Sequence, residues 1–170
     1  MGTLVAEASG LVSLGIVADS DPDPLSIYLD HYQAVVPDTV VEELREIAEH
    51  DDVHGRAART VLDRADAFRT EAVDLDAEFP LDDGENAAVT LANDIDADLF
   101  HCDEFNHLGL IHASLANTRV VTTPTLLSVF VRNEAFSSAK PRDLLDEISD
   151  ARTWETNSYV QRARSLIERS

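Results

Sequence analysis

Cysteine, lysine and long apolar runs are all scarce in this chain of 170 residues. The single cysteine, Cys102, excludes a disulfide framework and a cysteine-based zinc module. No apolar run approaches the ~18 residues that a membrane span requires, so we expect no membrane partner. The first apolar run is not preceded by basic residues, and no signal peptide is therefore expected. These absences predict a soluble protein with a cytoplasmic location.

Basic residues are few as well, with 13 Lys and Arg against 33 Asp and Glu, for a net charge of −20. The hydrophobic fraction of 44% is that of a folded domain rather than of a disordered acidic tail. Two interpretations of the charge stay open. The carboxylates bind cations or basic partners, or they adapt the surface to a high-salt cytoplasm. In such a cytoplasm the Debye length is about 3 Å, so repulsion between surface charges is screened. The spread of acids along the whole chain and the presence of only one lysine, Lys140, favour the halophilic interpretation. The acidic charge then does not exclude a nucleic-acid substrate.

Short apolar runs alternate with helical patterns along the chain. We expect strands near residues 3–7, 33–36, 71–75, 98–102 and 119–122. Helices are expected at residues 9–17, 38–49, 54–72, 85–93, 104–115, 124–131, 140–149 and 153–169. The alternation predicts an α/β fold with a mainly parallel central sheet of about four or five strands flanked by helices. Residues 1–135 should form this domain, and residues 136–170 should add a C-terminal helical extension packed on the same core.

Acidic residues recur where the predicted elements begin or end. Glu7 ends the first strand, and Asp103 and Glu104 follow the strand at 98–102. Glu85 lies at the start of its helix, and Glu43 lies one turn into the helix after Pro37. Ligands of parallel sheets bind beyond the carboxyl ends of the strands, so these acids can converge there. Converging carboxylates repel one another unless a cation bridges them, and their oxygens suit Mg²⁺ or Mn²⁺. Any one of these acids is expected by chance in so acidic a chain, and it is the joint pattern that indicates a site for phosphodiester hydrolysis.

Four segments in order resemble the motifs of the PIN domain, the fold of many VapC-like metal-dependent ribonucleases. The resemblance covers roughly residues 3–135 and is carried by Leu4–Leu14, Val36–Leu44, Gly84–Ala92 and Ala97–Glu104, followed by the small-residue turn at Thr122–Leu127. The Gly84–Glu85 pair is similar to that of archaeal members, in keeping with the halophilic interpretation.

The resemblance implies RNA cleavage that depends on Mg²⁺ or Mn²⁺. It implies that Glu7, Glu43, Glu85 and Asp103 are the catalytic residues and metal ligands, with Glu104 as an auxiliary ligand. Many members are toxins inhibited by an antitoxin, and many dimerise, so an antitoxin partner and a homodimer are implied too. The chain departs from the family at one point, because Glu7 stands where the first motif normally has Asp. A catalytically silent PIN-like module that binds protein is therefore the alternative function.

Three further features carry two interpretations each. Ser9 is either an ordinary helix cap or a hydrogen-bond partner of a metal-site carboxylate. His107 either orients an acid or is a polar surface residue, with a transition-metal site beside Asp103 as the alternative. The arginines of the tail outnumber its acids, which favours a packed helix end but also allows a face toward RNA. They are Arg152, Arg162, Arg164 and Arg169.

Overall fold

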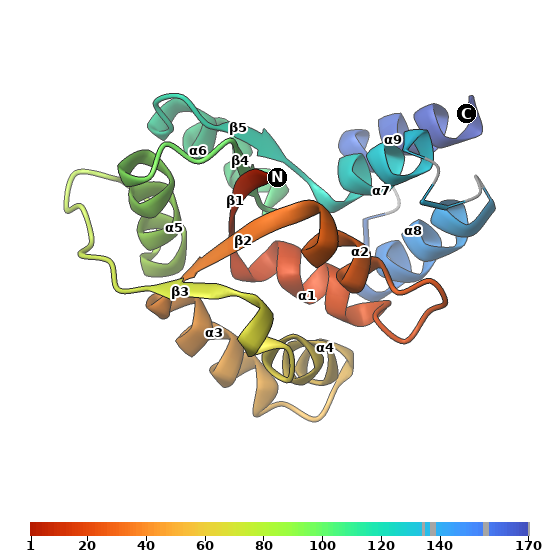
Figure 1. Ribbon diagram of the computed structural model, residues 1–170, viewed down its shortest axis with the longest axis horizontal. Helices are drawn as coiled ribbons and strands as arrows, with labels where there is room; N and C mark the ends of the chain where they lie inside the picture. Colours follow the sequence, from red (N-terminus) through yellow and green to blue (C-terminus); the bar gives the residue numbers. More distant parts are fainter. Residues whose placement is uncertain (134, 137–138, 155–156, 170) are drawn as a thin grey trace.

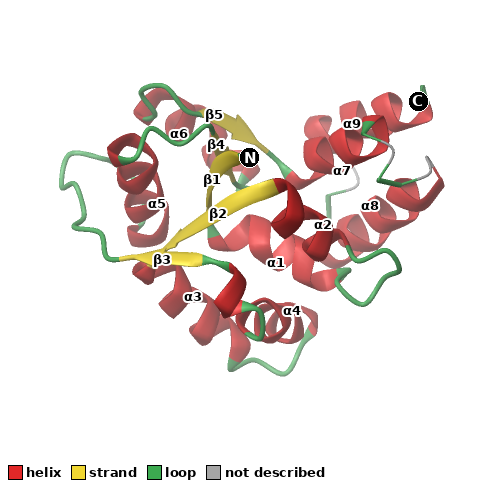
Figure 2. Ribbon diagram, in the orientation of Figure 1, coloured by secondary structure: helices red, strands yellow, loops and turns green. Residues whose placement is uncertain are grey.

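Five strands form one parallel sheet in the order β3-β2-β1-β4-β5 (Figure 1, Figure 2). The structure is a computed structural model that describes residues 1–133, 135–136, 139–154 and 157–169. The strands are β1 (Gly2–Ala6), β2 (Tyr32–Pro37), β3 (Arg69–Glu71), β4 (Leu99–His101) and β5 (Arg119–Val121). All four strand pairs are parallel, which confirms the predicted α/β class and sheet type.

The central strands are mostly apolar because both faces of the sheet are covered. Successive side chains of a strand point to opposite faces. Val5 and Val35 accordingly belong to one apolar cluster, whereas Leu4 and Val36 belong to the other. The first cluster is covered by α5 (Asp83–Asp94) and α6 (Leu108–Ser114). The sheet is thus the middle of three layers.

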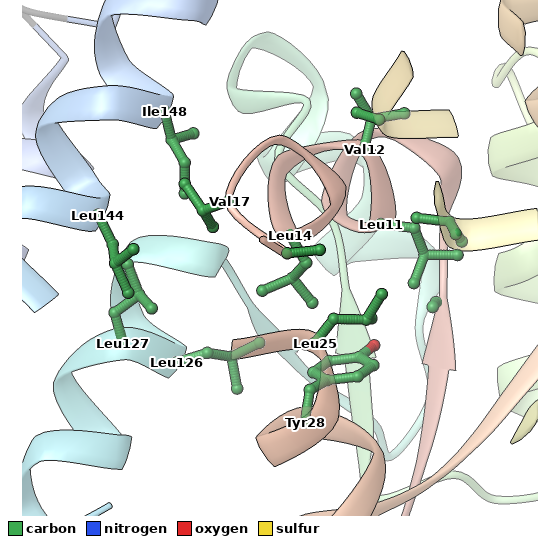
Figure 3. Close-up of a cluster of buried hydrophobic side chains, with 14 of the residues drawn as sticks. Leu11, Val12, Leu14, Val17, Leu25, Tyr28, Leu126, Leu127, Leu144 and Ile148 are labelled. Atoms are coloured by element: carbon green, nitrogen blue, oxygen red, sulfur yellow. The ribbon is translucent and has the colours of Figure 1, made fainter. Parts of the chain in front are cut away.

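The second face is covered by a larger group of helices, with α1 at its centre. The group comprises α1 (Ala8–Ile16), α2 (Pro24–His31), α3 (Asp38–Ala48), α4 (Val53–Leu62), α7 (Thr123–Arg132), α8 (Ala139–Arg152) and α9 (Ser158–Glu168). Figure 3 shows Leu14 of α1 between Tyr28 of α2, Leu126 of α7 and Ile148 of α8. Each of these side chains is buried, and burying one such side chain contributes roughly 1.5–3 kcal/mol. The C-terminal helices α8 and α9 therefore share the core of the strands, and they lie together with α7 in Figure 1.

Several segments differ from the sequence expectation, among them the last helix, α9, which begins at Ser158 instead of residue 153. Helix α4 ends at Leu62 instead of continuing to residue 72, and the chain then forms a 3₁₀ turn (Ala65–Ala67) and β3. Pairing with the edge of β2, where Val36 lies opposite Thr70, overrides the helical pattern there. Helix α6 begins at Leu108 rather than at residue 104, after a 3₁₀ turn at Phe105–His107. Among the described residues, no helix is both long and apolar enough to cross a membrane.

The strand order places a topological switch point at β1. From this central strand the chain proceeds outward to β2 and β3, and it then crosses back to β4 and β5 on the other side. Ala6 at the end of β1 lies opposite His101 at the end of β4, and the backbone N–H of Glu7 donates to the carbonyl of His101 at 3.0 Å. The crevice at such a point is where parallel sheets bind ligands. Glu7 and Asp103 both lie there, directly after their strands.

Candidate active site

Glu7 leaves β1 and caps the first turn of α1. Its carboxylate accepts a hydrogen bond from the backbone N–H of Ser9 at 3.0 Å and a second from the Ser9 hydroxyl. The Ser9 oxygen in turn accepts from the backbone N–H of Asp103 at 2.9 Å. Ser9 is therefore the partner of a carboxylate, as one interpretation predicted, while the cap of the helix is Glu7. Burial raises the pKa of Glu7 despite these bonds.

Helices α3 and α5 bring further acids to the same place. A hollow of about 450 Å³ lies in front of Glu7, and Arg152, His50 and His54 also line it. Six acids line this hollow, which we call the acid hollow: Glu7, Glu43, Asp52, Asp82, Glu85 and Glu104. Asp82 caps α5, accepting from the backbone N–H of Glu85 at 2.9 Å. Four of the five predicted site residues therefore meet in one hollow.

Two carboxylate oxygens in this group are buried without a hydrogen-bond partner among the described residues, Oε2 of Glu43 and Oε2 of Glu85. Burial raises the pKa of Glu43 from 4.5 to about 7, and the charges of Glu7, Asp82 and Glu85 add to the rise. Burial likewise raises the pKa of Glu85 to about 7, with Asp82 opposing its ionisation. Each acid is therefore protonated in a substantial fraction of molecules at neutral pH when no metal cation is bound.

His107 makes the direct contact to Glu85, with Nδ1 2.8 Å from Oε1. The ring is about half exposed, and the bond to Glu85 raises the pKa of His107. His107 therefore orients an acid, as one sequence interpretation predicted. Its partner is Glu85 of α5 rather than Asp103, which lies only four residues away in sequence.

Asp103 is held from the other side of the crevice. Its Oδ1 accepts from the backbone N–H of Thr123 at 2.7 Å, and its Oδ2 accepts from the Thr123 hydroxyl at 2.5 Å. Asp103 is 4% exposed and lines a neighbouring hollow rather than the acid hollow. The structure thus links Asp103 to Glu7 through Ser9, but does not bring it into the group around Glu43 and Glu85.

A buried chain of hydrogen bonds extends behind Asp103. Nε2 of His101 lies 2.8 Å from Oγ1 of Thr123, and Nδ1 lies 3.0 Å from the hydroxyl of Tyr28. The Thr123 hydroxyl donates to Asp103, so its oxygen accepts from Nε2–H and Nδ1 accepts from Tyr28. Burial lowers the pKa of His101 to about 4, so the imidazole ring is neutral at neutral pH. Asp103 is thereby fixed by a line of three buried side chains.

Comparison with known families supplies the remaining observation. A family model described as PIN domain matches residues 3–169, nearly the whole chain. The chain belongs to the PIN domain family. This membership supports nuclease activity in general. No protein among curated sequences matches the chain.

The donor chemistry of this PIN domain fits a divalent cation. Within the described ranges, no group of three or more His, Cys, Asp or Glu side chains is arranged to hold a metal ion as it stands. The acid hollow nevertheless supplies carboxylate oxygens, the ligands that Mg²⁺ and Mn²⁺ prefer. A cation there would satisfy the two unpartnered oxygens of Glu43 and Glu85 and offset both the burial and the repulsion that raise their pKa values.

Sequence reasoning missed three members of this PIN domain site, which are Asp52, Asp82 and His101. An Asp three residues before Glu85 is the pattern of a capped helix and was the available signal for Asp82. His101 was counted only as part of a strand. A histidine in an otherwise apolar run was its signal, but the partners in Tyr28 and Thr123 come from distant segments.

Proposed function

We propose that this PIN domain is a ribonuclease that cleaves RNA phosphodiester bonds with Mg²⁺ or Mn²⁺. The observation that carries the proposal is the pair of buried, unpartnered carboxylate oxygens of Glu43 and Glu85, which lie among four further acids. Natural proteins rarely leave buried acceptors unsatisfied, and such groups indicate a function or a bound ion. Family membership supports the nuclease class independently.

In this proposal Glu7, Glu43 and Glu85 hold the cation, Glu104 assists, and Asp103 completes the catalytic set across Ser9. When bound, the cation supplies charge stabilisation to the phosphate and lowers the pKa of water. The protein supplies the positioning: Ser9 holds Glu7, Thr123 holds Asp103, and His107 holds Oε1 of Glu85 while Oε2 stays unpartnered. The pKa values of about 7 for Glu43 and Glu85 mean that the empty site loses protons when a cation enters.

The resemblance to VapC-like members extends the proposal to biological context. We include an antitoxin protein partner, a homodimer and a cytoplasmic location in it. The net charge of −20 supports a high-salt, archaeal setting. Residues 1–135 would form the catalytic unit and residues 136–170 its C-terminal extension.

The test is cleavage of single-stranded RNA in concentrated KCl with Mn²⁺. Glu43→Gln and Glu85→Gln should each reduce the rate by orders of magnitude, because each removes a charge that the cation requires. Glu42→Gln is the matched control, since Glu42 is exposed on the same helix as Glu43. Equal rates in all four proteins would refute the site, and no cleavage by the wild type across metals and salts would refute the enzyme.

Glu7 supports the second candidate function, a silent module that binds protein. Glutamate is one methylene longer than the aspartate usual in the first motif, and the described side chains do not yet form a three-ligand group. Glu7→Asp separates the two candidates. Cleavage that appears only in Glu7→Asp would identify the natural chain as a binding module, whereas wild-type cleavage that Glu7→Asp leaves intact supports the enzyme.

A further inference from the structure

Arg152, the last residue of α8, projects from the C-terminal extension to the mouth of the acid hollow. Its Nη1 donates to the backbone carbonyl of Ser9 at 3.0 Å and to the hydroxyl of Ser13 at 3.3 Å. Its guanidinium carbon lies 5.5 Å from the centre of the Trp154 ring. These contacts fix the guanidinium group of Arg152 beside Ser9, the residue that holds Glu7.

Arg152 has no carboxylate partner in the part of the chain that the structure describes. The ion pairs there join Arg64 to Asp23, Arg69 to Glu71, Arg164 to Asp146 and His107 to Glu85. An arginine next to six acids would be expected to pair with one of them. Arg152 instead uses one nitrogen on a carbonyl and a hydroxyl, which leaves its full positive charge at the site.

A second hollow of about 890 Å³ adjoins the acid hollow, and Arg152, Glu104 and His54 line both. Its lining is rich in groups that donate and accept hydrogen bonds: Asn106, Thr153, Asn157 and Ser158. Asp103 also lines it, and Phe105 and Trp154 add two aromatic rings whose centres are 4.8 Å apart. Tyr159 stacks on Phe105 at 5.4 Å and is 45% exposed, so an aromatic surface continues to the solvent.

We propose that Arg152 binds a phosphate of single-stranded RNA and that the second hollow takes the adjoining nucleotide. The proposal rests on the proposed function and names the strand that its active site receives. A guanidinium matches the oxygens of a phosphate and keeps its charge at any working pH. An unpaired base finds polar edges and an aromatic surface in the second hollow, which is how single strands are recognised. A cation in the acid hollow and Arg152 beside it would then face two neighbouring phosphates.

The experiment measures binding of the full chain to a single-stranded RNA oligonucleotide in EDTA, where no cleavage complicates the signal. A KCl series is used over which circular dichroism shows the protein folded. Arg152→Ala should weaken affinity about tenfold, as expected for the loss of a charge-assisted contact. It should also reduce the slope of log affinity against log KCl concentration by about 0.7, which is the contribution of one neutralised phosphate on a single strand. Arg152→Lys should retain the slope and recover only part of the affinity.

Arg164→Ala is the matched control, because it removes the same charge from the same extension but from an arginine already paired with Asp146. It should leave both affinity and slope unchanged. Ser13→Ala tests for a merely structural effect, since it removes the Ser13 contact and keeps the cation. Equal losses in Arg152→Ala and Arg164→Ala, an equal loss in Ser13→Ala, or no measurable wild-type binding would each overturn the proposal. RNA binding that depends on Arg152, together with no cleavage when Mn²⁺ replaces EDTA, would instead refute the proposed function alone.

Discussion

The stability of the metal-free protein should fall as the pH rises through about 7, and Glu85 is the residue that shows it best. Its carboxylate is buried, and its pKa in the folded protein is about 7 against an ordinary value of 4.5. The native state therefore holds this proton more tightly than the unfolded chain does. The resulting stability is complete below the unfolded value and is lost as the pH rises through the folded one.

The magnitude follows from the same two values. At about 1.4 kcal/mol for each pKa unit, the difference corresponds to about 3 kcal/mol. Glu85 is 2% exposed, but its carboxylate also contacts the half-exposed ring of His107, so about 3 kcal/mol is an upper bound. Glu43 is only partly buried and interacts with Glu85, so we do not add a second contribution of the same size. For a chain of this length, about 3 kcal/mol corresponds to roughly 6–12 °C in melting temperature.

The assay compares thermal melts of the wild type and Glu85→Gln, in EDTA and constant KCl, between about pH 5 and about pH 8. Glutamine imitates the protonated acid, so the two proteins should melt together at the acid end. At the alkaline end the variant should be more stable by up to about 3 kcal/mol. Added Mg²⁺ should raise the melting temperature of the wild type at the alkaline end, because a ligand stabilises the state that binds it. The melting temperature of the variant should rise much less.

Glu42→Gln controls for the removal of one charge from the surface. It should follow the wild type across the whole range. If Glu85→Gln is less stable than the wild type at the alkaline end without metal, the contact between Oε1 and His107 outweighs the cost of burying the charge, and the reasoning from the unpartnered Oε2 is wrong.

Three other perturbations test separate parts of the site. Gly84→Ala should reduce severalfold the rise in melting temperature produced by Mn²⁺, because a Cβ at Gly84 would overlap Oε2 of Glu43. A rise as large as that of the wild type would contradict the role of Glu43 as a metal ligand. Thr123→Val removes the hydroxyl between His101 and Asp103 and should cost about 2 kcal/mol in urea unfolding. An unchanged midpoint would show that Asp103 is not held by this chain of bonds. Removing KCl should lower the melting temperature progressively, because repulsion among 33 acids loses its screening, and a melt independent of salt would argue against halophilic adaptation.

Much of the architecture follows from local pattern. The apolar runs that became β1, β2, β4 and β5 and the helical spacings of α1, α3 and α7 are visible in the chain itself. Their alternation is enough to predict a parallel sheet. The residues that follow parallel strands all lie at the carboxyl edge of that sheet. For that reason Glu7 and Asp103 could be assigned to the same crevice before any coordinates were considered.

Local pattern was misleading where a neighbouring segment competed with it. Residues 65–72 continue a helical spacing. Arg69–Glu71 nevertheless form a strand, because they pair with the edge of β2. The resemblance also implied that Asp103 is a metal ligand together with Glu43 and Glu85. Both Asp103 oxygens instead accept from Thr123 at the start of α7, and Asp103 does not line the acid hollow.

The sequence by itself determined the α/β class, the acids at the ends of the elements and the likeness to PIN domains. Only the tertiary structure decided which acids share a hollow, that His107 holds Glu85, that His101 lies behind Asp103, and that Arg152 reaches the site from the far end of the chain. The physical reason is that periodicity and capping act within a few residues. Burial, unpaired oxygens and raised pKa values arise only when segments distant in sequence exclude water from the same carboxylates.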